Sequence, residues 1–212
     1  MERFGFRPHG YVEPQEARSI IVAVRAVSRH PDRDSLLLEL LWQSGARVSE
    51  ALTLVPERVG FTAVGLYNLK QKQQKQTGLP PIKEVEISES LCNRLKQYCI
   101  TYRIKEGDYI FKPNTKSKLP HLSRNYVWWI VNRASEYAKV YKLGRRTTKN
   151  IIGYRGAWPH LFRHGNAMKL LEETGDITIV KEQLGHAYIS TTQGYAYAKK
   201  PRVRKEIAKI EW

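Results

Sequence analysis

Apolar positions in the first part of the chain recur at the spacing of an amphipathic helix. A helix is predicted over 14–28, and its apolar face consists of Ala17, Ile20, Ile21, Val24 and Val27. A second helix is predicted over 35–43, because Asp34 can cap its first turn and Gly45 can end it. A third, short helix is predicted from Val48.

The following stretch changes from helical to strand periodicity. Residues 62–69 and 84–88 are predicted to be short strands that flank the polar sequence KQKQQKQTGLPPIK. Gly78, Pro80 and Pro81 mark a turn within this sequence. The two strands are therefore expected to form a hairpin.

Helical patterns return in the second half of the chain. They are predicted over 88–103, 123–142, 159–175, 177–184 and 190–198. Residues 143–158 are basic and predicted to be irregular, whereas the tail, 201–212, is basic and amphipathic, with an apolar stripe of Val203, Ile207 and Ile210. The whole pattern predicts a mainly α fold with a small antiparallel β-sheet, an α+β class.

Charge is the first feature that bears on function. The 212 residues contain 36 Lys and Arg against 20 Asp and Glu, a formal net charge of +16 at pH 7. Such a surplus costs self-repulsion in a compact chain, so it predicts a polyanionic partner. Nucleic acid is the first interpretation, an anionic membrane surface the second, and solubility alone the third. An apolar fraction of 42%, with five Trp and twelve Tyr, favours a folded domain.

The cellular setting follows from three further observations. The longest apolar runs, 20–24 and 36–41, are too short to span a bilayer. No apolar signal core follows the basic start of the chain. Cys92 and Cys99 lie in one helical pattern and cannot join distant elements, which is typical of a reducing interior. The sequence therefore predicts a cytoplasmic protein with no membrane contact.

The segment SGARVSEAL brings an arginine and a carboxylate together. Arg47 follows a glycine turn and opens a short helix, and Glu50 lies one helical turn later. A buried arginine beside a carboxylate has a fixed orientation and stays charged. The alternative is a surface ion pair, which is the usual interpretation of this spacing.

The segment HLFRH is a candidate phosphate site. His160 and Arg163 share a face near the N-terminus of the helix that Pro159 begins, where backbone N–H groups favour anions. His160 and His164 also have the spacing of zinc ligands, but no acidic residue lies between them, so the metalloprotease pattern fails. A core histidine is the plain alternative.

The segment LGHAYISTTQGYAY joins a turn to a helix. Gly185 ends one helix, and His186 lies in the turn. Ser190 caps the next helix, which contains Tyr195. A tyrosine at helical spacing is usually a core residue, so this segment gains weight only beside the others.

The predicted hairpin supplies a cluster of lysines, namely Lys70, Lys72, Lys75 and Lys83. A lysine near a hairpin tip can reach into a cleft and donate a proton. The alternative is a charge run exposed to solvent, which is the usual case.

Together, and in this order, these segments resemble the tyrosine recombinase (phage integrase) family. The resemblance extends from about Pro14 to Tyr197, and LGHAYISTTQGY is its most specific motif. YIFKPNTKSKLPHLS, ahead of the helix that Ser123 begins, is similar to the segment that precedes the family's DNA-contacting helix. The resemblance implies the catalytic-domain fold of the tyrosine recombinases.

The resemblance also implies a reaction. The chain would be a site-specific DNA recombinase or integrase that cleaves and rejoins strands through a 3′-phosphotyrosine intermediate. The implied catalytic residues are Arg47, Lys75, His160, Arg163, His186 and Tyr195. Tyr195 would be the nucleophile, the arginines would neutralise the phosphate, and the histidines would bind the phosphate and manage protons near the phenol. No cofactor and no metal would be required, because the bond energy stays in the phosphotyrosine.

Two of these assignments have rivals. Lys75 is expected to be the general acid for the leaving 5′-oxygen, because KQTG is similar to the Lys-Thr-Gly arrangement of some integrases with one residue inserted. That insertion leaves Lys72 as a rival. The spacing from LGH through STTQ favours Tyr195 over Tyr188 and Tyr197 as the nucleophile.

The resemblance divides the chain into an N-terminal arm (1–13), a catalytic domain (14–198) and a tail helix (199–212). The tail would dock on a neighbouring protomer, as is usual in the family, or on its own domain. Family members typically carry an N-terminal helical domain that completes a clamp round DNA, so this chain would be a fragment or a minimal single-domain enzyme.

The expected partner is double-stranded DNA, on which the chain would self-associate into dimers or tetramers. The side chains expected to contact the DNA backbone are Lys116, Lys118, Arg124, Arg145, Arg146 and Lys149. Its place would be the nucleoid, in a prokaryote or a viral element. The alternative functions are relaxation of DNA by a type IB topoisomerase and DNA binding by a non-catalytic regulator.

Overall fold

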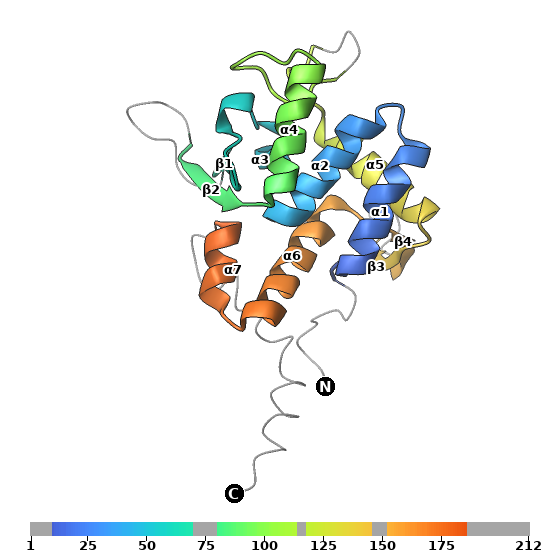
Figure 1. Cartoon of the computed structure of the whole chain (residues 1–212). Coiled ribbons are helices and arrows are strands. Elements are labelled where there is room, and N and C mark those ends of the chain that lie inside the picture. The colour runs from blue at the N-terminus through green and yellow to red at the C-terminus, as the bar shows by residue number, and fades with distance from the viewer. Residues whose placement is uncertain (1–9, 70–79, 114–117, 146–151, 186–212) are drawn as a thin grey trace, which may run out of the picture.

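The computed structural model describes residues 10–69, 80–113, 118–145 and 152–185. In chain order the elements are α1 (Pro14–Val27), α2 (Pro31–Ser44), α3 (Val48–Leu52), the 3-10 turn η1 (Pro56–Arg58), β1 (Ala63–Tyr67), β2 (Ile82–Glu86), α4 (Glu89–Thr101), α5 (Arg124–Tyr137), β3 (Tyr141–Arg145), β4 (Ile152–Gly156), α6 (Pro159–Thr174) and α7 (Ile177–Leu184). Among the described residues helices predominate and the named strands pair as two antiparallel hairpins, which confirms the predicted fold class (Figure 1).

Helix α2 lies in the middle of the molecule, in contact with α1, α4 and α6 (Figure 1). Its apolar positions are nearly continuous, and the buried ones are Leu36, Leu37, Leu38, Leu40 and Leu41. A helix that is apolar on most sides packs in a core. Its last residue, Ser44, is fully buried as well, so α2 leads the chain into the interior.

The start of α2 differs from the prediction. The helix begins at Pro31, because proline suits the first helical turn, where its missing N–H is not needed. Asp34 is therefore not the cap but a buried residue within the helix. Its carboxylate accepts hydrogen bonds from Ser28 Oγ (2.5 Å), Arg33 Nε (2.8 Å) and Tyr126 Oη (2.6 Å). This network joins the start of α2 to α5.

The predicted hairpin is present as β1 and β2, which pair antiparallel along their whole lengths. Both strands are shifted by one or two residues from the expected bounds, and β2 begins at Ile82. Val64, Leu66 and Val85 are buried, so one face of the hairpin packs on the core. The expected turn falls mainly in residues 70–79, outside the described part of the chain.

A second hairpin replaces the irregular segment predicted over 143–158. Helix α5 ends at Tyr137, five residues earlier than predicted, and β3 then pairs antiparallel with β4. Lys139 has a φ of 57°, a left-handed conformation that interrupts the helix. Gly144 and Gly153 face each other in the register, so the apolar alternation typical of strands is missing from the sequence.

Helices α6 and α7 enclose a second, small apolar cluster. Its buried members are Ala167, Met168, Leu171, Val180 and Leu184. Helix α6 begins at Pro159, as predicted, and the predicted Gly175 is its C-cap residue. Helix α7 follows Asp176, whose carboxylate accepts from Thr178 N at 2.7 Å, and its C-cap residue is Gly185. At the end of α7, Leu184 therefore lies against Gly45, at the buried end of α2.

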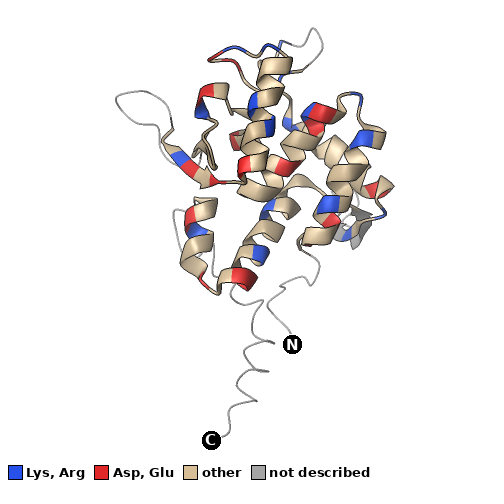
Figure 2. Ribbon diagram, viewed as in Figure 1, with Lys and Arg blue, Asp and Glu red and all other residues tan. Residues whose placement is uncertain are grey.

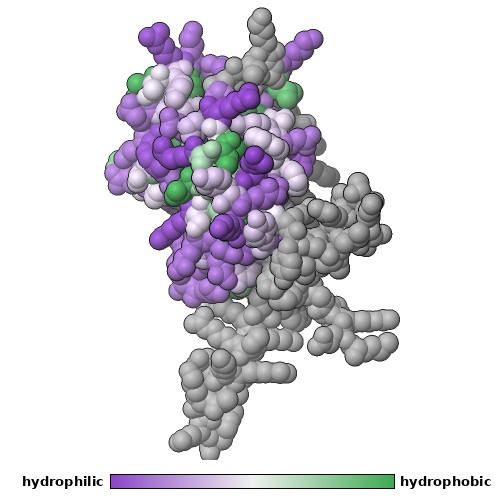
Figure 3. Space-filling model, turned by 90° about the vertical axis from the view of Figure 1, so that its right-hand side faces the viewer, coloured by the Kyte–Doolittle hydropathy of each residue, from purple (hydrophilic) through white to green (hydrophobic). Residues whose placement is uncertain are grey.

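Acidic and basic side chains are interspersed over the described ribbon (Figure 2). The face in Figure 3 is mostly hydrophilic, with small apolar areas between the polar ones. Most of the surplus of Lys and Arg over Asp and Glu falls in segments outside the described residues. Among the helices that are described, none combines the length and apolar character needed to cross a bilayer.

Candidate active site

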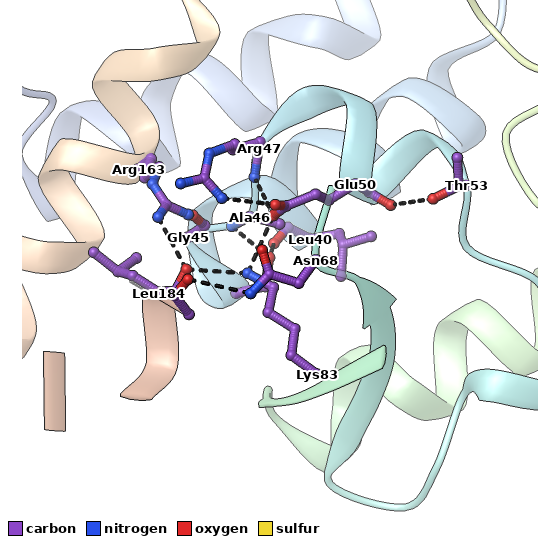
Figure 4. Close-up of polar contacts among 12 residues, drawn as sticks. Leu40, Gly45, Ala46, Arg47, Glu50, Thr53, Asn68, Lys83, Arg163 and Leu184 are labelled. Atoms are coloured by element: carbon purple, nitrogen blue, oxygen red, sulfur yellow. Dashed lines mark hydrogen bonds and ion pairs between the residues drawn. The ribbon is translucent and has the colours of Figure 1, made fainter. Parts of the chain in front are cut away.

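A glycine turn after α2 brings distant segments together. Gly45 ends α2 with a φ of 59°, in the left-handed region. A Cβ at this position would lie 2.5 Å from Leu184 Cδ2 and 2.6 Å from Asn166 Oδ1, so glycine is required both for the conformation and for the space. The turn therefore lets α6 and the end of α7 approach the chain just before Arg47 (Figure 4).

Arg47 is fixed by the carboxylate of Glu50. Arg47 is the N-cap residue of α3, and its Nη1 lies 2.7 Å from Glu50 Oε1, while its backbone N–H donates to Glu50 Oε2 at 3.1 Å. The Glu50 side chain is fully buried, whereas 24% of the Arg47 side chain is exposed. The buried carboxylate therefore orients a guanidinium that solvent, or a ligand, can still reach.

Arg163 lies deeper than Arg47 and on a different element. It occupies the second turn of α6 and is 2% exposed. Its Nη1 donates to Gly45 O at 2.6 Å and its Nη2 donates to Leu184 O at 2.9 Å. These two carbonyls, at the ends of α2 and α7, set the orientation of the guanidinium (Figure 4).

Lys83 supplies a third cation. It projects from β2, its side chain is 10% exposed, and its Nζ lies 3.1 Å from Glu50 Oε2. The same ammonium donates to Leu184 O at 3.1 Å. One carboxylate therefore has cationic partners from α3 and from β2.

The ionisation of this cluster follows from its burial and its charges. Burial favours a higher pKa for Glu50, but Lys83 and then Arg47 outweigh it and lower the pKa below its ordinary value. Burial lowers the pKa of Lys83, the Glu50 carboxylate opposes this, and Arg163 adds to it. With Arg47, Arg163 and Lys83 against one carboxylate, the cluster suits an anionic ligand.

His160 and His164 lie side by side at the start of α6. His160 is exposed, and the two ring centroids are 4.4 Å apart in an edge-to-face arrangement. Burial, followed by the nearby His160 and Arg163, lowers the pKa of His164 to about 4. His164 is therefore neutral near pH 7. The described residues contain no group of three or more His, Cys, Asp or Glu side chains that could bind a metal ion.

The structure thus brings together Arg47 and Arg163, and it places His160 on the helix that carries Arg163. The other predicted catalytic residues, Lys75, His186 and Tyr195, lie outside the described residues. Of the predicted DNA contacts, Lys118 and Arg124 are exposed beside and at the start of α5, and the backbone of Arg145 ends β3. The remaining predicted contacts, Lys116, Arg146 and Lys149, also lie outside.

The particular contacts of Lys83 were not predicted from the sequence. The sequence named it only as one of four hairpin lysines, and the other three, Lys70, Lys72 and Lys75, lie outside the described residues. The sequence did contain a signal that Lys83 faces the interior. Lys83 precedes the buried residues Val85 and Ile87 at a spacing of two, and alternate residues of a strand share a face.

The end of α7 is joined to the hairpin by further polar contacts. Asn68, just after β1, donates from Nδ2 to Gly185 O at 3.4 Å. Gln183 donates from Nε2 to Glu86 O at 2.8 Å and accepts from Glu86 N at 3.3 Å, so its amide pairs with the backbone of β2. Strand β2 and the residue just after β1 therefore contact the end of α7, directly before His186.

The sequence can now be compared with known proteins. The profile of the phage integrase family matches residues 11–202. The chain is 33% identical to tyrosine recombinase XerA of Pyrococcus horikoshii over 179 residues, which cover 84% of this chain and 55% of that protein. It is 31% identical to tyrosine recombinase XerD of Staphylococcus epidermidis, over 82% of this chain and 52% of that protein.

Solved structures share the fold at lower identity. A crystal structure of XerA recombinase has a TM-score of 0.69 and 19% identity, over 95% of this chain and 66% of that one. The post-cleavage complex of XerH with a difH substrate has a TM-score of 0.68 and 21% identity, over 94% and 52%. The catalytic domain of bacteriophage HP1 integrase has a TM-score of 0.58 and 20% identity, over 94% of both chains.

This chain spans about half the length of the curated relatives that it matches. The family profile nevertheless covers most of the chain, and the identity to XerA extends over most of it. The glycine turn, the Arg47–Glu50 pair and the buried Arg163 lie within both matches. The chain therefore belongs to the phage integrase family, that of the tyrosine recombinases.

Proposed function

We propose that this chain is the catalytic part of a site-specific DNA recombinase. The observation that carries the proposal is the pair of arginines, Arg47 and Arg163, which come from different elements and meet at the Gly45 turn. Two guanidiniums near one point can neutralise the non-bridging oxygens of a phosphodiester as negative charge develops on them. The relatives' names, tyrosine recombinase XerA and XerD, support the same reaction.

The proposed reaction exchanges one phosphodiester for another. The phenol oxygen of Tyr195 attacks the scissile phosphorus, a bond forms between them, and the bond to the 5′-oxygen breaks. A lysine of the hairpin, Lys75, protonates that leaving oxygen, while the phenol proton passes to a neighbouring base. The products are a 3′-phosphotyrosine and a free 5′-hydroxyl. The reverse attack by a 5′-hydroxyl reseals the strand, so the reaction needs no external energy source.

The histidines complete the proposed site. His160, exposed on the first turn of α6, binds a non-bridging oxygen of the phosphate. His186 follows the end of α7, and its position in the chain suits a hydrogen bond to the phosphate and proton transfer near the phenol.

A trapping experiment tests the nucleophile. A pool of nicked duplexes with a randomised central region loses its short leaving strand on cleavage, so the covalent adduct accumulates and withstands sodium dodecyl sulfate. We expect the wild-type chain to form this adduct and Tyr195→Phe to form none while binding DNA equally well. Tyr188→Phe and Tyr197→Phe are the matched controls and should react like wild type. An adduct formed by Tyr195→Phe would refute the assignment.

The same substrate, once a reactive sequence has been selected from the pool, tests the general acid. A 5′-bridging sulfur leaves without protonation, so it should restore cleavage by Lys75→Ala and leave the wild-type rate little changed. If only Lys72→Ala is restored in this way, Lys72 is the acid instead.

Two other functions give different results. A type IB topoisomerase would relax supercoiled plasmid without exchanging strands between two sites, whereas a recombinase exchanges them. A DNA-binding regulator would form no covalent adduct at all. Among these, recombination is favoured because the relatives at 33% and 31% identity bear the name tyrosine recombinase.

Helix α5 and its surroundings are the proposed DNA interface. Trp128 and Trp129 are 43% and 48% exposed on this helix, and Arg124 is exposed at its first turn. Lys118 lies exposed shortly before the helix. Aromatic and basic side chains on one exposed helix suit a nucleic acid, because the cations bind phosphates and the rings can pack on sugars or bases. The DNA would be that of the nucleoid or of a viral element, in the cytoplasm.

Self-association would use the basic tail. A groove of about 1010 Å³ lies among α1, α2, β2, α6 and α7, and its acidic lining residues are Glu39, Glu84, Glu86 and Glu182. Apolar side chains, among them Ile21, Val22 and Ile179, line it as well. The tail, 201–212, combines basic residues with an apolar stripe, which complements this lining. The proposed occupant is the tail of a neighbouring protomer.

Deletion of residues 201–212 should abolish dimers or tetramers on DNA in a sedimentation measurement. Unchanged assembly would overturn the proposal that the tail joins neighbouring protomers.

A further inference from the structure

The buried contacts of Lys83 are unusual for a lysine in a hairpin. Lysine side chains are normally exposed, because burial of the ammonium is costly unless it is paired and hydrogen-bonded. Lys83 is 10% exposed, and its ammonium contacts both Glu50 Oε2 and Leu184 O. The cost of its burial is therefore offset by a carboxylate and a carbonyl that both belong to the candidate site.

Each contact of Lys83 leads to a different arginine. Through Glu50 it reaches Arg47, whose Nη1 binds the other carboxylate oxygen at 2.7 Å. Through Leu184 O it reaches Arg163, whose Nη2 binds the same carbonyl at 2.9 Å. A single ammonium on β2 is thus linked to both proposed phosphate ligands, through the Glu50 carboxylate to Arg47 and through one carbonyl oxygen to Arg163 (Figure 4).

Lys83 also contacts the chain where α7 ends. Gly185 has a φ of 62°, and a Cβ built on it would lie 2.7 Å from Lys83 Cδ and 3.2 Å from Lys83 Nζ. The backbone therefore passes directly against the lysine, one residue before His186. Carbonyl groups at a helix C-terminus carry partial negative charge and favour a cation beside them.

We propose that Lys83 is a positioning residue that fixes β2 relative to Arg47 and to the end of α7. The proposal rests on the proposed recombinase function. Lys83 acts through Glu50 on Arg47 and through Leu184 on the backbone that leads to His186 and Tyr195.

A competing role must be separated from this one. The pKa of Lys83 is lowered by its burial, and a lysine with a lowered pKa is a better proton donor. Lys83 could therefore be the general acid itself. A positioning residue and a general acid differ in one measurable respect, because only the loss of an acid is repaired by a leaving group that needs no proton.

The test uses the full chain and the selected nicked duplex, with either oxygen or sulfur at the 5′-bridging position. Lys83→Met removes the charge and keeps a similar length, Lys83→Arg keeps a cation, and Lys105→Met is the matched control at an exposed lysine. DNA affinity and the single-turnover rate of adduct formation are measured for each variant.

For a positioning residue we expect Lys83→Met to bind DNA like wild type but to cleave about 100-fold more slowly, a typical cost of misplaced reacting groups. The loss should be equal with oxygen and sulfur, and Lys83→Arg should recover most of the rate. Lys105→Met should match wild type in every measurement.

Three results would overturn the proposal. Wild-type cleavage by Lys83→Met would mean that its contacts are not needed. Restoration by sulfur alone would make Lys83 the acid. If circular dichroism shows that Lys83→Met does not fold, Lys83→Arg decides instead. A folded Lys83→Arg that cleaves about 100-fold more slowly than wild type would exclude a role for the cation. Absence of an adduct with the wild-type chain would instead refute the proposed function.

Discussion

At the scale of single residues, the site depends on how the protein stabilises ionised groups away from water. Glu50 is fully buried and remains ionised because Lys83 and Arg47 lie against its two oxygens. For His164, on α6, the charged form is disfavoured instead. It is partly buried beside His160 and Arg163, so its neutral form is favoured.

The lowered pKa of His164 predicts a pH-dependent stability. The unfolded chain binds a proton at this histidine below about pH 6.5, whereas the folded chain resists protonation until about pH 4. The stabilisation is therefore complete above pH 6.5 and is lost as the pH falls toward 4, by on the order of 3 kcal/mol in total. Urea unfolding at a series of pH values measures it.

The variant His164→Asn isolates this contribution. Its free energy of unfolding should fall less steeply than that of wild type between pH 6.5 and 4, while the difference between the two stays constant from pH 7 to 8. Parallel curves over the whole range would show that His164 does not titrate in this way.

At the scale of secondary-structure elements, two close approaches determine the site. The end of α2 approaches α6 and α7 at Gly45, and the end of α7 approaches β2 at Gly185. Gln183 strengthens the second approach by pairing its amide with the backbone of Glu86. The end of α7 is thus joined to the hairpin through Gly185 and through the amide of Gln183.

Replacement of Gly45 by alanine tests the first approach. The left-handed conformation is unfavourable for alanine, and its Cβ would overlap Leu184 and Asn166, so we expect a loss of about 2–4 kcal/mol in the free energy of unfolding. Cleavage should slow as well, because Arg163 binds Gly45 O. Chemical denaturation and the adduct assay measure the two effects.

Gly107→Ala is the matched control for this variant. Gly107 also has a positive φ, of 80°, but nothing lies within 4 Å of a Cβ at that position. It should lose only the cost of the backbone conformation, about 1 kcal/mol, and keep full activity. Equal losses for the two variants would mean that crowding at Gly45 is unimportant.

The elements also show what could be predicted from the sequence. The helix that begins at Pro159 was predicted because proline suits a first helical turn and Gly175 suits the end of a helix. The second hairpin was not predicted, because Gly144 and Gly153 interrupt the apolar alternation that is typical of strands. Arg47 and Arg163 could be named from their motifs, but their meeting at Gly45 depends on tertiary contacts between residues far apart in the chain. The hydrogen bond between Lys83 Nζ and Leu184 O likewise depends on tertiary contacts between distant parts of the chain.

At the scale of the whole molecule, charge is unevenly distributed. Acidic and basic residues are interspersed along the described ribbon (Figure 2), whereas residues 118–145 contain Lys118, Arg124, Arg133, Lys139, Lys142 and Arg145 against the single acid Glu136. This stretch includes α5 and its exposed tryptophans. Lys142 is buried and paired with Glu16, but Lys118 and Arg124 are exposed, so basic side chains are accessible at the proposed DNA interface.

A salt titration tests this interface. Each phosphate contact releases counterions, so the affinity for duplex DNA should fall linearly with salt on logarithmic axes. Arg124→Ala and Lys118→Ala should each reduce the slope by about one, as expected for the loss of one phosphate contact. Lys96→Ala, at an exposed lysine on α4, should leave the slope unchanged. Unchanged slopes for all three variants would place the DNA elsewhere.

The inward orientation of Lys83 limits where the hairpin can change in length. Adjacent residues of a strand point to opposite faces, so one residue inserted within β2 would turn this ammonium toward solvent and bring a neighbour against Glu50. An insertion between the strands, in residues 70–79, would leave the register of Lys83 intact. Natural length variation in this hairpin is therefore expected between its strands, where the distance from Lys75 to the cleaved bond could be adjusted without disturbing the arginines.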